Sequence, residues 1–322
     1  MSFRLRFRTL YLCLAITLVL GGLNPPLAQS KSFCFAKLIS WFKPASALEL
    51  AQQSVLRGHL QEAVFLFKKA GDVDRAAALE NQIQRSLRDE DIVSSELLGT
   101  GSSSPELITT QSGVRAVKKL DRAFDGANAN SEVAVYALDQ YFDGVFNVPV
   151  TVKRTLNGKT YSLQAYVETA QIGLPSDTSP NLEFLDFIID NTDRFGGTNL
   201  LLTKEKIRVP IDHGLGFRTS ESLRRGWHQK ESPWSRVLAL NCYDKYSGRM
   251  NRKCMQEIVV QSLPDRAVYK KFKETSDAEF TRLFSSLLDE DELKIFLKRK
   301  AYFIGTAEEY LKTNGYPVHR KP

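Results

Sequence analysis

The spacing of apolar residues is strand-like in the middle of the chain. Residues 97–120 contain short apolar runs separated by a Gly/Ser-rich turn and by Ser112-Gly113, which predicts three strands, the last ending at Lys118. Residues 147–170 predict two more strands around an Asn157-Gly158 pair, because this pair favours the tight turn of a β-hairpin. The middle of the chain is therefore predicted to be a small β-rich unit.

Helical spacing dominates the remainder. A helix is predicted over residues 131–144, with Ser131 as its N-cap and Glu132 in its first turn. After Asp212, apolar residues recur at helical spacing in five segments: 234–240, 254–262, 265–275, 277–288 and 290–313. A small β-rich part followed by a larger helical part predicts the α+β fold class.

Residues 48–87 predict two or three short helices, with breaks at Gly58 and at Gly71-Asp72, like one tetratricopeptide-type hairpin. A single hairpin cannot bury its own apolar face. We therefore expect it to pack on the following domain or to bind a partner protein. The predicted domains are a helical one over 48–90 and a larger one over 95–317, with the polar stretch 88–95 as the joint.

The N-terminus has the build of a secretory signal. Three arginines precede an apolar stretch over residues 10–20, which is too short to span a bilayer comfortably as a helix. We predict a signal peptide over 1–28, with cleavage after Ala28 or as late as Ala47. The alternative is retention as a membrane anchor, with residues 33–43 at the interface. Both place the remainder outside the cytosol: secreted, periplasmic or in a secretory-pathway lumen.

Charge and cysteine content add little to this picture. The net charge of +7 falls to +4 without the three leader arginines, which does not indicate a nucleic-acid partner. Cys242 and Cys254 are close enough in sequence for a loop-closing disulfide in an oxidising compartment, and two reduced thiols are the alternative.

Three polar residues follow one another in an order that suits phosphoryl transfer. An apolar, strand-like run begins at Phe184 and leads to Asp193; Asn199 precedes a second strand-like run, and Asp212 follows it. Phosphoryl transfer from a nucleotide needs a carboxylate beside the attacking hydroxyl and oxygen ligands for a divalent metal. The alternative is a pair of ordinary turns, because Asn and Asp favour turns by themselves.

The stretch from 184 to 217 resembles the atypical kinase fold of phosphatidylinositol 3- and 4-kinases, HipA-type serine kinases and secretory-pathway kinases such as the Golgi casein kinase and Four-jointed. These families carry Asp-Arg in the catalytic loop and an Asp-x-Gly metal motif, as Asp193-Arg194 and Asp212-His213-Gly214 do. The motif is most similar to type II phosphatidylinositol 4-kinases. The resemblance covers roughly residues 95 to 313 and implies a two-lobed fold, with a β-rich N-lobe and a helical C-lobe.

The resemblance also implies the site. Asp193 and Arg194 are its catalytic pair, and Asn199 and Asp212 hold Mg²⁺ or Mn²⁺. The family places the metal-binding Asn five residues after the Asp, where this chain has Thr198, so Asn199 is displaced by one residue. In Asp-His-Gly, His213 stands where other kinases carry Phe or Asn, and it is expected to have a structural role.

Upstream residues are expected to bind ATP. Lys118 ends a strand and is assigned to the phosphates and to an ion pair with Glu132, and Lys119 is the competing candidate on the other strand face. A flexible linker is the alternative for the glycine-rich loop. The remaining expected nucleotide contacts are Gly99, Gly101 and Ser102 at the phosphates, where glycine amides approach anions closely, and Gln164 and Tyr166 in the strand that leads to the adenine.

The sequence thus predicts an exported, ATP-dependent kinase that phosphorylates a hydroxyl on a protein or glycan. Two alternatives remain open at this stage. One is a phosphatidylinositol kinase that acts on membrane lipid. The other is a nucleotide-binding pseudokinase that uses the 48–90 helices as a contact surface.

Overall fold

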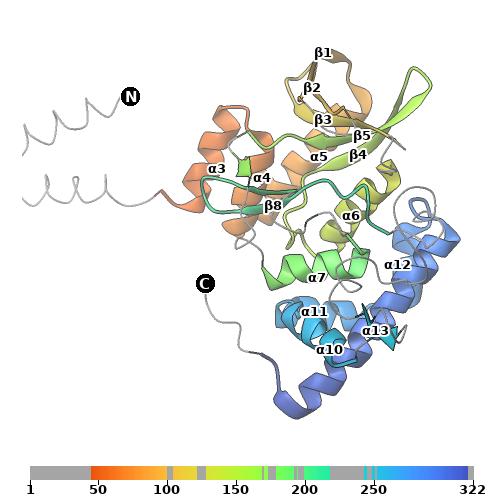
Figure 1. Ribbon diagram of the computed structural model, residues 1–322. Coiled ribbons are helices and arrows are strands. Elements are labelled where there is room, and N and C mark those ends of the chain that lie inside the picture. Colours follow the sequence, from red (N-terminus) through yellow and green to blue (C-terminus); the bar gives the residue numbers. More distant parts are fainter. Residues whose placement is uncertain are drawn as a thin grey trace, which may run out of the picture. The chain divides into compact units, whose positions relative to one another are not determined.

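A five-stranded antiparallel sheet forms the upper part of the molecule in Figure 1. The computed structural model describes residues 45–99, 104–121, 128–168, 170–172, 179–191, 194, 199–217, 243–244, 249–250 and 252–317. The strand order is β1-β2-β3-β5-β4. Their bounds are Ile92–Leu97 (β1), Glu106–Thr110 (β2), Arg115–Leu120 (β3), Thr151–Leu156 (β4) and Lys159–Ala165 (β5).

The predicted strands are confirmed with one shift. Asn157 and Gly158 both have positive φ, 50° and 75°, as the predicted hairpin turn requires. Strand β1, however, begins at Ile92 and occupies much of the stretch predicted to be a joint. Its residues are mostly exposed because it lies at the edge of the sheet, so its apolar pattern is weak.

Helix α6 (Ala129–Tyr141) lies against the sheet and carries Glu132. Its N-cap is Asn128, whose side chain accepts from the amide of Asn130, and the prediction of Ser131 as N-cap is wrong. The Ser131 hydroxyl instead donates to the carbonyl of Gly216 at 3.0 Å. The helix therefore begins earlier than the sequence predicts, and Ser131, inside its first turn, is used for a contact with a distant segment.

Asp139 of α6 binds the backbone of the loop that follows the helix. Its carboxylate is fully buried and accepts from the amides of Phe146 and Val148, at 2.8 and 2.9 Å. Burial raises the pKa of Asp139 from 3.8 to about 7, although the charge of Lys68 and the two amides lower it in part.

The raised pKa of Asp139 predicts a pH dependence of stability. The folded state holds the proton more tightly than the unfolded chain, so the free energy of unfolding should fall as pH rises from about 4 to 7. In urea titrations, Asp139→Asn should reduce this fall by up to about 1.4 kcal/mol per pH unit. Asp143→Asn, at an exposed position, should leave it unchanged. Equal slopes in the wild type and Asp139→Asn would contradict the prediction.

The apolar run at Phe184 is a helix, α7 (Pro180–Ile189), so the strand predicted there is wrong. Ser179 caps it and Pro180 occupies the first turn. A short apolar run shows too few periods to separate helix from strand. The next strands, β7 (Leu200–Leu202) and β8 (Arg208–Pro210), form a small sheet with β6 (Gln171–Ile172).

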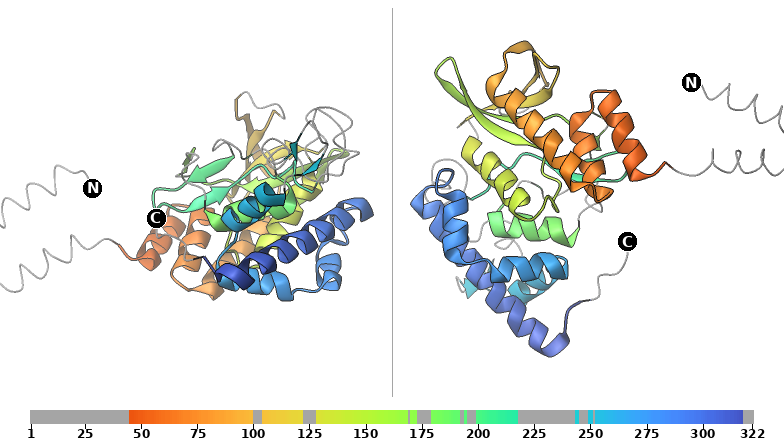
Figure 2. Two further views of the ribbon diagram at one scale, coloured as in Figure 1. Left: turned by 60° about the horizontal axis from the view of Figure 1, so that its bottom comes forward. Right: turned by 180° about the vertical axis from the view of Figure 1, so that it is seen from behind.

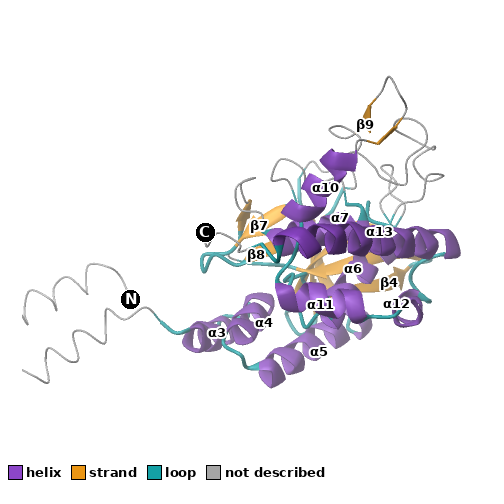
Figure 3. Ribbon diagram, turned by 90° about the horizontal axis from the view of Figure 1, so that it is seen from below, coloured by secondary structure: helices purple, strands orange, loops and turns teal. Residues whose placement is uncertain are grey.

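Four of the five helices predicted after Asp212 are confirmed, and residues 234–240 lie outside the described residues. Helix α13 crosses α7 and α10 in Figure 3, and phenylalanines at 184, 272, 280, 284, 296 and 303 form the core around it. The bounds are Arg252–Gln261 (α10), Arg266–Glu274 (α11), Asp277–Phe284 (α12) and Glu290–Asn314 (α13), and two short strands, β9 (Tyr243–Asp244) and β10 (Arg249–Met250), precede them.

Three helices precede the sheet, with the predicted breaks: α3 (Ala47–Leu56), α4 (Leu60–Lys69) and α5 (Val73–Asp89). Gly58 and Gly71 have φ of 77° and 76° at these breaks. The view from behind in Figure 2 shows α5 beside the sheet, and the buried residues of α4 and α5 belong to the same core as the sheet. The apolar face of the hairpin is therefore covered within this chain.

Two expectations concern residues that the structure leaves out. Residues 1–44, including the expected signal, and Cys242 lie outside the described residues, so the leader and the Cys242–Cys254 bridge stay predictions. Among the helices that are described, none is both long and apolar enough to cross a membrane.

Candidate active site

Three charged side chains from three separate elements meet beside the sheet. Lys119 of β3 places its Nζ 3.0 Å from Glu132 Oε1 and 2.7 Å from Asp212 Oδ1. Glu132 comes from α6, and Asp212 follows β8. A cation is thus held between two carboxylates that are 80 residues apart in sequence.

This arrangement corrects the assignment of Lys118. Lys118 lies on the opposite face of β3, where it pairs with Glu106 at 2.8 Å, its direct cross-strand neighbour. The partner of Glu132 is Lys119, the competing candidate. Strand alternation separates the two lysines, but it does not tell which strand face turns toward α6.

Burial makes this cluster electrostatically strong. The Lys119 side chain is 11% exposed, and burial alone would lower its pKa, but the charges of Glu132 and Asp212 outweigh burial and raise it. For Glu132, burial opposes ionisation, but the charge of Lys119 together with the hydrogen bonds from His213 outweighs it, and the pKa lies below its usual range. Lys119 and Glu132 are therefore both charged at neutral pH.

His213 contacts the second carboxylate oxygen of Glu132. Its backbone amide donates to Glu132 Oε2 at 3.0 Å, and its fully buried ring lies with Nδ1 3.6 Å from the same oxygen. Burial lowers the pKa of His213, so its imidazole is neutral. The amide of Asn128 also donates to the carbonyl of Gly214, which fixes the start of α6 against the Asp-His-Gly turn.

Arg194, the second member of the expected catalytic pair, makes its observed contacts within the protein, and its catalytic role stays a prediction. Its side chain is buried, and its Nε donates to both carboxylate oxygens of Asp186, at 3.0 and 2.9 Å. Its Nη1 donates to the carbonyls of Asn199 and Ile211. Arg194 thereby ties α7 to the segments that carry the two expected metal ligands, and its guanidinium is turned toward the protein interior.

A second buried arginine, which sequence reasoning missed, supports the same loop from α13. Arg299 is 1% exposed, its Nε donates to the carbonyl of Ile188 at 3.2 Å, and its Nη1 lies 3.1 Å from Asp190 Oδ2. It therefore fixes the end of α7, immediately before the Asp193 loop. An arginine inside a charged helix carries no sequence signal that would have identified it.

The structure describes some of the remaining expected site residues and not others. Asp193, Gly101 and Ser102 lie outside the described residues, while Gly99 follows β1 with φ of 76°. Gln164 is buried in β5 and donates to the Thr151 hydroxyl at 3.1 Å.

Tyr166 follows β5, and its amide donates to the carbonyl of Arg115 at 2.9 Å. The Arg115 guanidinium lies 4.8 Å from the centroid of the Tyr166 ring. The side chains of Gln164 and Tyr166 therefore take part in sheet and ring contacts, and their contact with adenine stays a prediction.

Asn199 and Asp212 suit an ion of the magnesium type by their chemistry. The Asp212 side chain is 36% exposed, and carboxylate and amide oxygens are the ligands that such ions prefer. Both residues have positive φ, 59° and 57°, a conformation that Asn and Asp adopt more readily than other non-glycine residues. Among the described residues alone, no group of three or more His, Cys, Asp or Glu could hold a metal, and Asp193 is not among them.

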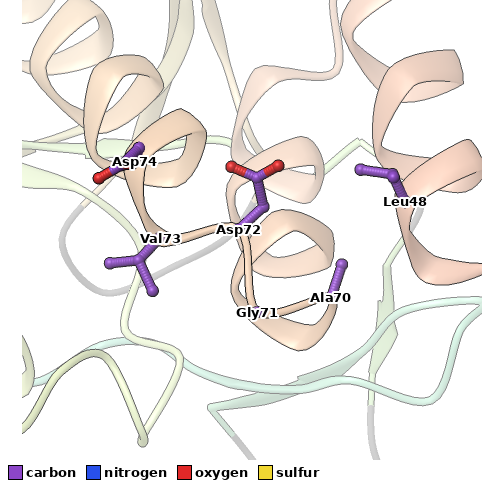
Figure 4. Close-up of a pocket in the computed structure, with 6 residues that line it drawn as sticks. All are labelled: Leu48, Ala70, Gly71, Asp72, Val73 and Asp74. Atoms are coloured by element: carbon purple, nitrogen blue, oxygen red, sulfur yellow. The ribbon is translucent and has the colours of Figure 1, made fainter.

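A surface depression at the turn between α4 and α5 is a different feature (Figure 4). Its volume is about 300 Å³, and it is lined by Leu48, Ala70, Gly71, Asp72, Val73 and Asp74. These lining residues include two aspartates and neither lysine nor arginine. The lining of this depression therefore does not suit a phosphate group.

The sheet with α6 against it and the helical part from α7 to α13 together form an α+β, two-lobed kinase-like fold, which confirms the predicted fold class. The fold is similar to that of the Golgi casein kinase with Mn/ADP bound, with a TM-score of 0.53 and 12% identity over 74% of this chain and 78% of that chain. It is also similar to the structure of hydra Fam20 with sugar, with a TM-score of 0.51 and 12% identity over 74% of this chain and 90% of that chain. No protein-family model and no curated protein matches the sequence.

Proposed function

We propose that this protein is an ATP-dependent phosphotransferase that transfers the γ-phosphoryl group to a hydroxyl on a protein or glycan outside the cytosol. The observation that carries the proposal is the Lys119–Glu132 pair joined to Asp212. Phosphoryl transfer is catalysed mainly by positioning and by neutralising charge on the phosphates. A buried, permanently charged lysine beside a half-exposed carboxylate suits both tasks.

Each residue has a role in this proposal. Lys119 holds the nucleotide phosphates, and Glu132 keeps its ammonium group in place. Asp212 and Asn199 hold Mg²⁺ or Mn²⁺, which when bound neutralises charge that develops on the phosphates. Asp193 accepts the proton of the attacking hydroxyl, and Arg194 and Arg299 fix the segments on either side of it. The Mn and ADP named for the similar Golgi casein kinase structure support this choice of ligands.

The acceptor and compartment rest on the sequence. The expected leader supports export, and export favours a protein or glycan over a cytosolic lipid. The resemblance of 184–217 to phosphatidylinositol kinases supports the lipid alternative, so the test must separate acceptor classes.

The test is transfer of labelled γ-phosphate from ATP in a secretory or envelope extract, with products separated into protein, glycan and lipid. We expect label in the protein or glycan fraction, and Asp193→Asn should reduce it by roughly 10²- to 10⁴-fold because the base is lost. Label in lipid alone would move the proposal to a lipid kinase. Equal label with the wild type and Asp193→Asn, with nucleotide still bound, would overturn transfer and leave a pseudokinase.

A further inference from the structure

Helix α6 presents a polar stripe to α5. Glu132, Tyr136 and Gln140 follow at four-residue spacing, so they lie along one side of α6. Gln84 Nε2 donates to Tyr136 Oη at 3.0 Å, and Gln140 Nε2 donates to Glu80 Oε1 at 3.0 Å. Glu80 and Gln84 are themselves one turn apart on α5. The helix that carries Glu132 is therefore bonded to α5 over two successive turns.

One partner in each of these contacts is buried, which makes the contacts costly to break. Tyr136 is 5% and Glu80 is 6% exposed, and Glu80 Oε1 also accepts from Lys68 Nζ at 2.7 Å. A buried donor or acceptor that loses its partner keeps its full desolvation cost. A shift of α6 that separates Glu132 from Lys119 would also move Tyr136 away from Gln84. The hydrogen bond between them would be lost, and the shift is disfavoured for that reason.

The α4–α5 hairpin is in turn fixed to the sheet that carries Lys119. Gln61 Oε1 accepts from the amide of Val150 at 3.0 Å, just before β4. Arg154 of β4 donates through Nη1 to the carbonyls of Leu87 and Glu90, at 3.1 and 2.6 Å. Helix α5 is thus bonded to the sheet on one side and to α6 on the other.

The loop after α6 approaches the same hairpin closely. Gly144 has φ of 73°, and a Cβ atom there would lie 2.1 Å from Lys68 Nζ. The positive φ favours glycine, and any larger residue would also require the Lys68 side chain to move. The hairpin meets α6 along its length and at the loop that follows it.

We infer that helices α4 and α5 are a positioning element, built into the chain, that fixes α6 and thereby the Glu132–Lys119 pair, with Gln84 and Tyr136 as the positioning residues. The inference rests on the proposed function for its catalytic consequence. Its structural consequence, that α5 suppresses motion of α6, is independent of catalysis.

The test compares Tyr136→Phe with Tyr269→Phe in the full-length protein. Both remove one hydroxyl from a tyrosine that is 5% exposed, and Tyr269 donates to Glu308 between α11 and α13, in the helical part. Hydrogen exchange of residues 129–141 and affinity for Mn–ADP are measured for both. We expect Tyr136→Phe to speed exchange in α6 and weaken Mn–ADP binding by about fivefold each, the factor for one ordinary hydrogen bond, and Tyr269→Phe to change neither.

Gln84→Leu should reproduce the effect of Tyr136→Phe, and the double variant should add nothing, because both remove one contact. Equal exchange in α6 for Tyr136→Phe and Tyr269→Phe, or additive effects of the two α5–α6 changes, would overturn the inference. Faster exchange in α6 in a protein that transfers no phosphate would uphold the positioning and refute only the proposed function.

Discussion

Replacing Lys119 by methionine should reduce phosphoryl transfer by roughly 10²- to 10³-fold, the usual cost of removing one group that stabilises developing charge. Lys119 is the cation between Glu132 and Asp212, while Lys118 is held by Glu106 on the other strand face. Lys118→Met should therefore stay within about threefold of the wild type, which is the matched control. The measurement is the initial rate of label transfer at saturating ATP.

Stability must be followed with this variant, because Lys119→Met leaves Glu132 buried and without its cation. Removal of one member of a buried pair costs about 3–5 kcal/mol. The double variant Lys119→Met, Glu132→Gln should recover part of the stability and none of the activity. Comparable activity in Lys118→Met and Lys119→Met would show that the phosphates bind elsewhere.

Arg194→Met should lower the free energy of unfolding by about 3–5 kcal/mol, the second large effect that the structure predicts. The variant would leave the Asp186 carboxylate buried, and burial already raises the pKa of this group against the charge of Arg194. It would also remove the donor to the carbonyls of Asn199 and Ile211. Urea unfolding at neutral pH measures the loss.

Arg282→Met is the matched control, because Arg282 is exposed on α12, and it should change the free energy of unfolding by less than about 0.5 kcal/mol. Replacing both members of the buried pair, Arg194→Met with Asp186→Leu, should recover stability while transfer remains impaired. A loss below about 1 kcal/mol for Arg194→Met alone would show that the guanidinium contributes little to the loop.

Local signals in the sequence predicted much of the fold. Asn157-Gly158 specifies its hairpin because both residues accept positive φ, and the segments after 254 repeat apolar residues at helical spacing for long enough to be unambiguous. The run at Phe184 failed because it is short: α7 has ten residues, and six consecutive positions from Phe184 contain one polar residue, which is too few to show a period. Local pattern thus succeeds where an element is long enough to show several periods or carries a specific turn signal.

The site was predictable only in part, for a related reason. The order of Asp193, Asn199 and Asp212 suits phosphoryl transfer and can be read locally, and in the structure Asp212 of this set lies beside Lys119. The choice between Lys118 and Lys119 depends on which strand face meets α6, and the role of Arg299 depends on where α13 crosses α7. Both are decided by contacts between distant segments, which no local pattern records.

Arg299 follows all the other proposed site residues in sequence, which has a consequence for biosynthesis. The ribosome completes the sheet, α6 and the Asp-His-Gly turn well before it reaches α13. Until Arg299 emerges, the carbonyl of Ile188 and the carboxylate of Asp190 have no guanidinium to hold them. A nascent chain that stops before α13 can therefore contain every residue proposed to act on ATP and still lack the guanidinium that contacts the end of α7.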